Sequence, residues 1–355
     1  AIAAEVLGVA TAVVALFQVR TSQGAIAWVV SLVAMPFLAV PAYWVFGRRR
    51  FKGYVTARRR HLKEMVAEAQ AIAQRHAARG VIDPPQDPAD AKTDKYLVAT
   101  AYFAWSTRHL AQAAAVLGKT EDAAHYGRLA DQVRDAFGAE YLLPDGRLTS
   151  DAQTAYALAL RFDLIANPAL REAAGARLAE LVAEAGNRIS VGFAGVNVLS
   201  DALTLVDRTN TAYDLLLEEE CPSWLYAVKK GATTVWERWD SLLPNDTVNP
   251  GTMTSFNHYA LGAVADWLHR VVAGISAAEP GYRVIRFAPR PGGGLTRASA
   301  EHETPYGRAS IEWTIADGSL TTRIVVPTGA TAIVELPGQD TTQVSSGSHV
   351  FTTPA

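Results

Sequence analysis

The sequence predicts a mainly α-helical chain with a β-rich tail, preceded by a transmembrane helical hairpin. Three observations support this: two charge-poor stretches near the amino terminus, helical spacing of apolar residues from 94 to about 275, and period-two alternation after Pro280. A chain of 355 residues has room for two or three domains. We expect a transmembrane hairpin (1–50), a basic juxtamembrane helix and linker or junction (51–93), a helical domain (94–278) and a small antiparallel β domain (279–355).

The hairpin is predicted from two apolar stretches joined by a short polar turn. Residues 25–47 carry no charge and exceed the roughly 20 residues that a helix needs to cross a bilayer. Residues 2–19 form the other stretch, which contains a single charge, Glu5. Basic residues cluster between Arg48 and Arg60, which favours a cytoplasmic location for the chain that comes after them. We expect a multi-pass protein of the cell membrane that contacts the lipid bilayer and has its carboxyl-terminal part in the cytoplasm.

After a segment rich in proline, glycine and aspartate, apolar spacing predicts seven helices joined by short loops, as in antiparallel helical hairpins. They lie at 103–117, 126–137, 152–160, 170–185, 198–206, 212–217 and 260–275. In the first, Phe103, Leu110, Ala114 and Leu117 share one face; before the third, Ser150 and Gln153 have capping-box spacing. Strands are expected at 283–288, 308–315, 320–326 and 331–336.

Composition excludes several classes of function. The net charge is -2, so no overall field favours nucleic acid, and we expect no nucleic-acid partner. A single cysteine, Cys221, excludes an internal disulfide and a cysteine-based zinc site. The eight histidines lack the i, i+4 spacing of a helical metal site, so neither a metal nor a cofactor is expected. The chain starts at Ala1 rather than Met, and we expect a partial sequence or an incomplete reading frame.

Two motifs suggest a sugar-cleaving pocket. Residues 236–241 read Trp-Glu-Arg-Trp-Asp-Ser, and residues 255–260 read Ser-Phe-Asn-His-Tyr-Ala. Indole faces stack on pyranose rings, a carboxylate polarises water, and Asn and His hold hydroxyls. The candidates are Glu237 as general base, with substrate contacts from Trp236, Trp239, Asp240, Asn257 and His258. The plainer alternatives are a surface glutamate paired with Arg238 and a structural histidine. Hydrolysis by acid and base needs two carboxylates, and the motifs supply one convincing candidate.

From residue 93 to about 338 the chain resembles the carboxyl-terminal part of bacterial α-L-rhamnosidases of the inverting type. The matching segments are 93–95, 100–104, 151–156, 192–193, 222–224, 231–234, 236–240, 255–259 and 291–295. The resemblance implies an (α/α)6 barrel followed by a β-sandwich, and hydrolysis of terminal α-L-rhamnose from a rhamnose-containing glycoside or oligosaccharide. It also implies that Glu237 is the general base and that His258 contacts the bound rhamnose.

One part of the family pattern is missing. The family's general acid is the glutamate of an Arg-Asp-Glu-Arg segment, which these 355 residues do not contain. Seven predicted helices also cannot build a twelve-helix barrel. We therefore expect a partial barrel and a truncated enzyme that lacks its general acid.

The first sixty or so residues resemble instead the anchor of bacterial cardiolipin synthases, notably at 27–30, 36–37, 41–44 and 46–48. Those enzymes use two His-x-Lys-x4-Asp motifs. Here His61-Leu62-Lys63 is followed by Glu68 where the aspartate should be, and no second copy exists. Two alternatives stay open: a cardiolipin-synthase-like membrane protein that retains only the anchor, and a non-catalytic carbohydrate-binding or vestigial protein.

Overall fold

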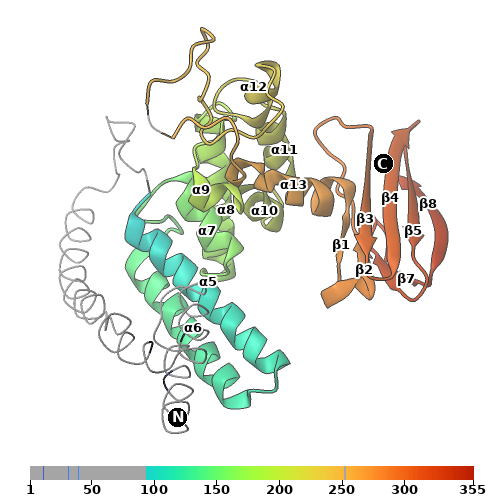
Figure 1. The fold of residues 1–355 in the computed structure, drawn as a ribbon, viewed down its shortest axis with the longest axis horizontal. Helices are drawn as coiled ribbons and strands as arrows, with labels where there is room; N and C mark the ends of the chain where they lie inside the picture. Colours follow the sequence, from blue (N-terminus) through green and yellow to red (C-terminus); the bar gives the residue numbers. More distant parts are fainter. Residues whose placement is uncertain (1–10, 12–30, 32–38, 40–92, 252) are drawn as a thin grey trace. The chain divides into compact units, whose positions relative to one another are not determined.

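The computed structural model describes residues 93–251 and 253–355, together with Thr11, Ser31 and Ala39 (Figure 1). The predicted hairpin (1–50) and the juxtamembrane linker (51–93) therefore lie outside the described residues, except for those three positions and Thr93. Within the described ranges, no helix combines the length and the apolar character needed to cross a membrane. The described region consists of a helical part followed by two β-sheets.

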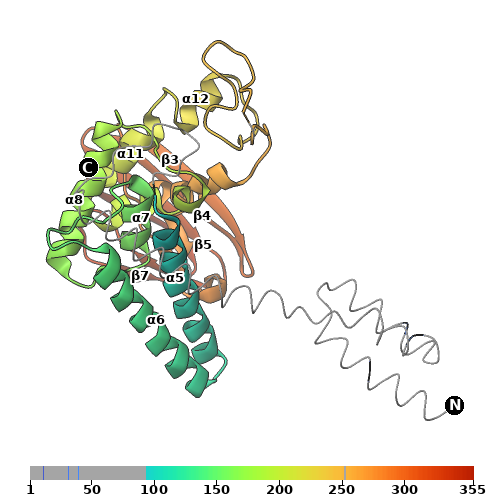
Figure 2. The same ribbon diagram turned by 90° about the vertical axis from the view of Figure 1, so that its left-hand side faces the viewer.

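Six of the seven predicted helices form as single helices, with ends that differ from the predicted ones by up to eight residues. The longer ones are α5 (Lys95–Val116), α6 (Thr120–Tyr141), α7 (Gln153–Arg161), α8 (Pro168–Glu184), α10 (Leu199–Leu205) and α11 (Thr209–Leu217). Helices α5 and α6 run side by side as an antiparallel pair (Figures 1 and 2). Helix α7 is central, since every side chain from Gln153 to Leu160 is buried. The motif-bearing loop follows α12 (Trp224–Lys229).

The helix predicted at 260–275 is three consecutive segments: η2 (Ala260–Ala263), α13 (Val264–Trp267) and η3 (Leu268–Ala273). A further short helix, α9 (Phe193–Val196), precedes α10. Gly274 ends the last segment in a left-handed conformation (φ 92°), where a residue without a Cβ is favoured.

The buried face of α5 differs from the predicted one. Phe103 is 50% exposed, Leu110 48% and Leu117 72%, whereas only Ala114 of the predicted set is buried. The buried residues are Leu97, Ala101, Ala104, Thr107 and Ala114. These are mostly small side chains, which permit close approach of α6 and leave the larger apolar ones outside.

The predicted capping box does not form. Ala152 is the N-cap of α7 and makes no side-chain capping bond. Gln153 instead spans the space between segments: its Oε1 accepts from Ser190 N at 2.8 Å, and its Nε2 donates to two backbone carbonyls. The Oγ of Ser150 accepts from Asp94 N at 3.1 Å. Tertiary hydrogen bonds therefore replace the local cap.

The tail is a sandwich of two four-stranded sheets. One has the order β1-β2-β6-β7, and the other β3-β4-β5-β8. The bounds are β1 (Ile275–Ala277), β2 (Val284–Phe287), β3 (Arg297–Thr304), β4 (Gly307–Ala316), β5 (Ser319–Val326), β6 (Thr331–Val334), β7 (Thr342–Val344) and β8 (Gly347–Pro354). The four predicted strands are β2, β4, β5 and β6. The expectation of a wholly antiparallel domain was wrong, because β2 and β6 pair in parallel. Strands β3, β4 and β5 form the crossover that such a pair requires.

The sandwich packs directly on the helical part. Trp313 of β4 is fully buried in the helical core, and its Nε1 donates to Val272 O at 2.8 Å. The Tyr213 hydroxyl of α11 donates to Arg290 O at 2.6 Å. These contacts join the helical part and the sandwich around a common core.

Candidate active site

The two predicted motifs lie side by side, joined by backbone hydrogen bonds. His258 N donates to Val235 O at 2.8 Å, and Glu237 N donates to Ser255 O at 2.8 Å. The Thr234 hydroxyl adds a hydrogen bond to Phe256 O. Backbone pairing therefore places the predicted base and the predicted sugar-binding histidine on neighbouring segments, although 21 positions separate them in the sequence.

Glu237 is partly buried, and one of its oxygens is anchored: Oε2 accepts from Ser255 N at 3.1 Å. In the described part of the chain Glu237 forms no ion pair, and Oε1 has no hydrogen-bond partner. The alternative, an ion pair between Glu237 and Arg238, does not form in this structure. The carboxylate is oriented by the backbone, with one oxygen available to a ligand or a water.

Arg238 pairs with Asp240 instead. Its guanidinium approaches both carboxylate oxygens of Asp240, with Nη2 at 3.1 Å from Oδ2. Asn249 Nδ2 also donates to Oδ2 at 2.9 Å. Both oxygens of the predicted substrate contact Asp240 are therefore engaged by the protein, which holds the loop in shape.

His258 lies in a stack of three rings. The ring of Phe193 is nearly parallel to it at 4.8 Å between centroids, and that of Tyr259 is nearly parallel to it at 5.2 Å. Its Nδ1 accepts from Ala260 N at 3.3 Å, so in the neutral ring Nε2 carries the proton and can donate to a ligand oxygen. The Asn257 side chain is exposed and makes no hydrogen bond to any described residue.

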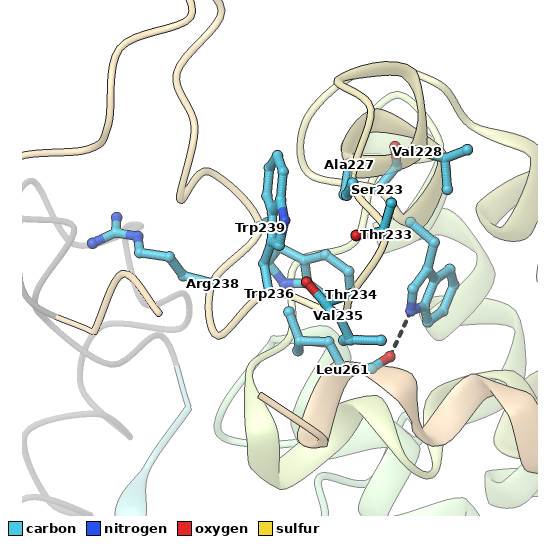
Figure 3. A pocket seen from close by; sticks show the side chains of 12 residues that line it. Ser223, Ala227, Val228, Thr233, Thr234, Val235, Trp236, Arg238, Trp239 and Leu261 are labelled. Carbon is cyan, nitrogen blue, oxygen red and sulfur yellow. Dashed lines mark hydrogen bonds between the residues drawn. The ribbon is translucent and has the colours of Figure 1, made fainter. Parts of the chain in front are cut away.

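The predicted stacking tryptophans occupy a different environment. Trp236 is only 5% exposed, with Phe256 packed edge-on at 5.3 Å. Trp239 is partly buried, and its Nε1 donates to Val191 O at 2.9 Å. Together with Trp224 they line a pocket of about 290 Å³ (Figure 3). Neither Glu237 nor His258 lines this pocket, so the predicted site residues fall into two groups.

Sequence reasoning gave no site role to Phe193 or Trp224. Both lie in segments that resemble the rhamnosidase family, and this resemblance could have indicated a role for them at the site. Their partners come from distant parts of the chain, and no local pattern predicts those contacts.

Cys221 lies near the same loop. Burial, followed in size by the charge of Asp240, raises the pKa of its thiol to about 11, so the thiol is protonated at neutral pH. Among the described residues, no cluster of His, Cys, Asp and Glu could hold a metal ion.

Comparison with protein families identifies the chain. The model of the bacterial alpha-L-rhamnosidase 6 hairpin glycosidase domain matches residues 8–272, and that of the bacterial alpha-L-rhamnosidase C-terminal domain matches residues 274–351. The chain belongs to the bacterial α-L-rhamnosidase family. The family's two-domain order agrees with the helical part and the sandwich that comes after it.

Individual rhamnosidases agree with this assignment. An alpha-L-rhamnosidase of Formosa agariphila is 38% identical over 262 residues, which are 73% of this chain and 28% of that protein. The Aspergillus terreus enzyme structure has a TM-score of 0.73 at 40% identity, covering 76% of this chain and 32% of its own. The Streptomyces avermitilis enzyme, solved with L-rhamnose, has a TM-score of 0.70 at 35% identity, covering 83% and 31%. The chain thus spans about a third or less of these relatives.

A short match concerns another family. Cardiolipin synthase A of Pseudomonas aeruginosa is 54% identical over 61 residues, which are 17% of this chain and 12% of that protein. The match agrees with the anchor resemblance but is too short to carry any of that enzyme's chemistry.

Proposed function

We propose that this chain forms the carboxyl-terminal part of an α-L-rhamnosidase that hydrolyses terminal α-L-rhamnose with inversion. The observation that carries the proposal is the backbone pairing of the two motifs, which brings the segments of Glu237 and His258 together. Glu237 is anchored by the Ser255 amide and forms no ion pair with any described residue. The family assignment and the L-rhamnose bound by the Streptomyces avermitilis relative support it. The substrate would be a rhamnose-containing glycoside or oligosaccharide.

Glu237 would act as the general base. In inverting hydrolysis a carboxylate deprotonates the water that attacks the anomeric carbon, while an acid about 6.5–9.5 Å away protonates the leaving oxygen. The Ser255 amide holds one oxygen of Glu237 in place, and the other is available to that water. His258 would donate from Nε2 to a sugar oxygen, since Nδ1 is occupied by the Ala260 amide.

No glutamate in this sequence matches the family's general acid. General acid assistance contributes roughly 10²–10⁴-fold, and most for poor leaving groups. We therefore expect these residues alone to hydrolyse natural rhamnosides negligibly, with trace activity on an aryl rhamnoside whose leaving group needs little protonation. The rival function, non-catalytic carbohydrate binding, predicts rhamnose binding without any aryl rhamnoside cleavage.

The test is an aryl rhamnoside assay of the chain and its Glu237→Gln variant. We expect Glu237→Gln to abolish the trace release of the aryl alcohol, because the amide cannot accept a proton. Glu301→Gln, which changes an exposed glutamate of the sandwich, is the matched control and should leave the rate unchanged. Activity that survives Glu237→Gln would refute the base assignment. Robust turnover of a natural rhamnoside would refute the missing-acid argument.

We further propose that residues 1–50 tether the chain to the cell membrane, with the carboxyl-terminal part in the cytoplasm. The two charge-poor stretches, the basic cluster after them and the match to cardiolipin synthase A support this. Carbonate extraction should leave the chain in the membrane fraction. Val33→Arg combined with Leu38→Arg should release it, because each charge in a span costs about 2.5–3.5 kcal/mol. Extraction of the unaltered chain would contradict the tether.

A further inference from the structure

A pocket lies beside the Trp236–Asp240 loop and is lined in part by its residues. It lies between α12, the adjoining segment 232–236 and Leu261, and its volume is about 290 Å³. That volume is just below the roughly 300–1,000 Å³ typical of small-molecule sites. The side chains of Glu237 and His258 do not line it, so an inference about this pocket does not depend on the proposed chemistry.

Its aromatic walls are fixed in place. Trp224 Nε1 donates to Leu261 O at 2.8 Å, the dashed bond of Figure 3. Trp239 Nε1 donates to Val191 O at 2.9 Å, and the two indoles meet edge to face at 5.6 Å and 84°. Rotating either ring would break its hydrogen bond. The walls are therefore preorganised, which lowers the entropic cost of binding.

Most polar side chains that line the pocket already form hydrogen bonds or ion pairs within the protein. Ser223 is fully buried, and its Oγ accepts from Tyr226 N at 3.1 Å. The Thr234 hydroxyl donates to Phe256 O. The side chain of Arg238 extends away from the other labelled residues in Figure 3 and pairs with Asp240.

Among the described residues that line the pocket, Thr233 therefore contributes the hydroxyl that makes no hydrogen bond. A sugar ring would bring several hydroxyls into this lining and leave most of them unpaired, which is unfavourable. A flat aromatic ring would bury its faces against the indoles at little such cost. The volume suits a single ring system.

We propose that this pocket binds a planar aromatic group that carries one polar substituent, such as a phenol, and that it does not bind a sugar. The ring would pack against Trp224 and Trp239, and the substituent would hydrogen-bond to the Thr233 hydroxyl.

The proposal is tested with the full chain and 4-fluorophenol, followed by ¹⁹F line broadening. We expect saturable binding with a Kd of about 1 mM, as for a ligand of this size. L-Rhamnose in excess should not displace the probe. Thr233→Ala should remove any preference for 4-fluorophenol over fluorobenzene. Displacement by L-rhamnose would overturn the proposal and assign the pocket to a sugar, and absence of protein-dependent broadening would overturn it outright.

A matched pair of variants locates the binding. Val228 lines the pocket and is 62% exposed, so Val228→Glu should fold while weakening 4-fluorophenol binding at least about tenfold. Val248 is 56% exposed and outside the pocket, so Val248→Glu should leave binding unchanged. Both variants are measured in the same detergent solution, so partition of 4-fluorophenol into the detergent affects the two measurements equally. Equal binding by the two variants would overturn the proposal.

Discussion

Asp151 shows how single side chains hold the segment before α7 against α8. Its Oδ2 accepts from Arg177 Nη2 at 2.8 Å, and its Oδ1 accepts from the Tyr156 hydroxyl at 2.7 Å. Burial by itself would raise the pKa of Asp151, but the hydrogen bonds from Arg177 and Tyr156 outweigh it and hold the pKa below its usual value. The folded state therefore favours the ionised form. Its contribution to stability is present above the unfolded pKa, about 3.9, and is lost as the pH falls through the folded pKa.

We predict that Arg177→Met lowers the free energy of unfolding by about 2 kcal/mol at pH 7, because a hydrogen-bonded, largely buried carboxylate loses its charged partner. The variant should also lose less stability between pH 5 and pH 3 than the unaltered chain. Urea unfolding across that range measures both effects. Arg308→Met is the control: its partners on β3 are exposed, so a cost below about 1 kcal/mol is expected. Equal costs for the two variants would contradict the assigned role of Asp151.

At the scale of elements, the helix-to-sandwich connection depends on one glycine. Gly274 lies between η3 and β1 with φ at 92°, and its carbonyl accepts from Ala288 N at 2.8 Å. A Cβ added there would lie 2.3 Å from Pro289 N and 2.4 Å from Pro289 Cα, which is far inside contact distance. The two segments can therefore approach only because this residue has no side chain.

Gly274→Ala should cost about 2–4 kcal/mol of unfolding free energy, from backbone strain together with steric overlap. Gly318→Ala, in the β4–β5 turn, is the matched control. Its φ is 70°, but nothing lies within 4 Å of an added Cβ, so about 1–2 kcal/mol from strain alone is expected. Thermal or urea unfolding compares the pair. A Gly274→Ala cost no greater than that of Gly318→Ala would mean that the connection tolerates a side chain.

The elements that could be predicted are those with a strong local pattern. Helices α6, α8 and α11 repeat apolar residues at helical spacing, and β5 alternates buried with more exposed residues. Strand β3 was missed because its inward side chains are small or polar, so the sequence Arg-Ala-Ser-Ala-Glu-His-Glu-Thr shows little apolar alternation. The β2–β6 pairing was missed because no local feature encodes a parallel crossover.

At the scale of the whole molecule, α5 presents an apolar stripe in the described region. Phe103, Leu110 and Leu117 are spaced by seven residues and are about half exposed or more. Exposed contiguous apolar surface drives association. We predict that residues 94–355, expressed alone, are poorly soluble and self-associate.

Leu110→Lys combined with Leu117→Lys should reduce that association without lowering the melting temperature, since neither side chain is buried. Sedimentation velocity measures the change. Val350→Lys, which alters an exposed residue of β8 outside the stripe, should have no effect on association. A monodisperse, cooperatively unfolding monomer of 94–355 without any substitution would contradict the prediction.

The sequence by itself determined where most of the longer helices lie, which two motifs are the candidates for chemistry and which family the chain resembles, because periodicity and sequence motifs are local properties. The assignments of Glu237 and His258 to substrate chemistry stay predictions. Only the tertiary structure decided which face of α5 is buried. It also decided that Trp236 and Trp239 line a pocket apart from Glu237, and that Asp240 is held by Arg238 and Asn249. Those outcomes depend on hydrogen bonds and packing between distant segments, and the spacing of residues along the chain does not encode them.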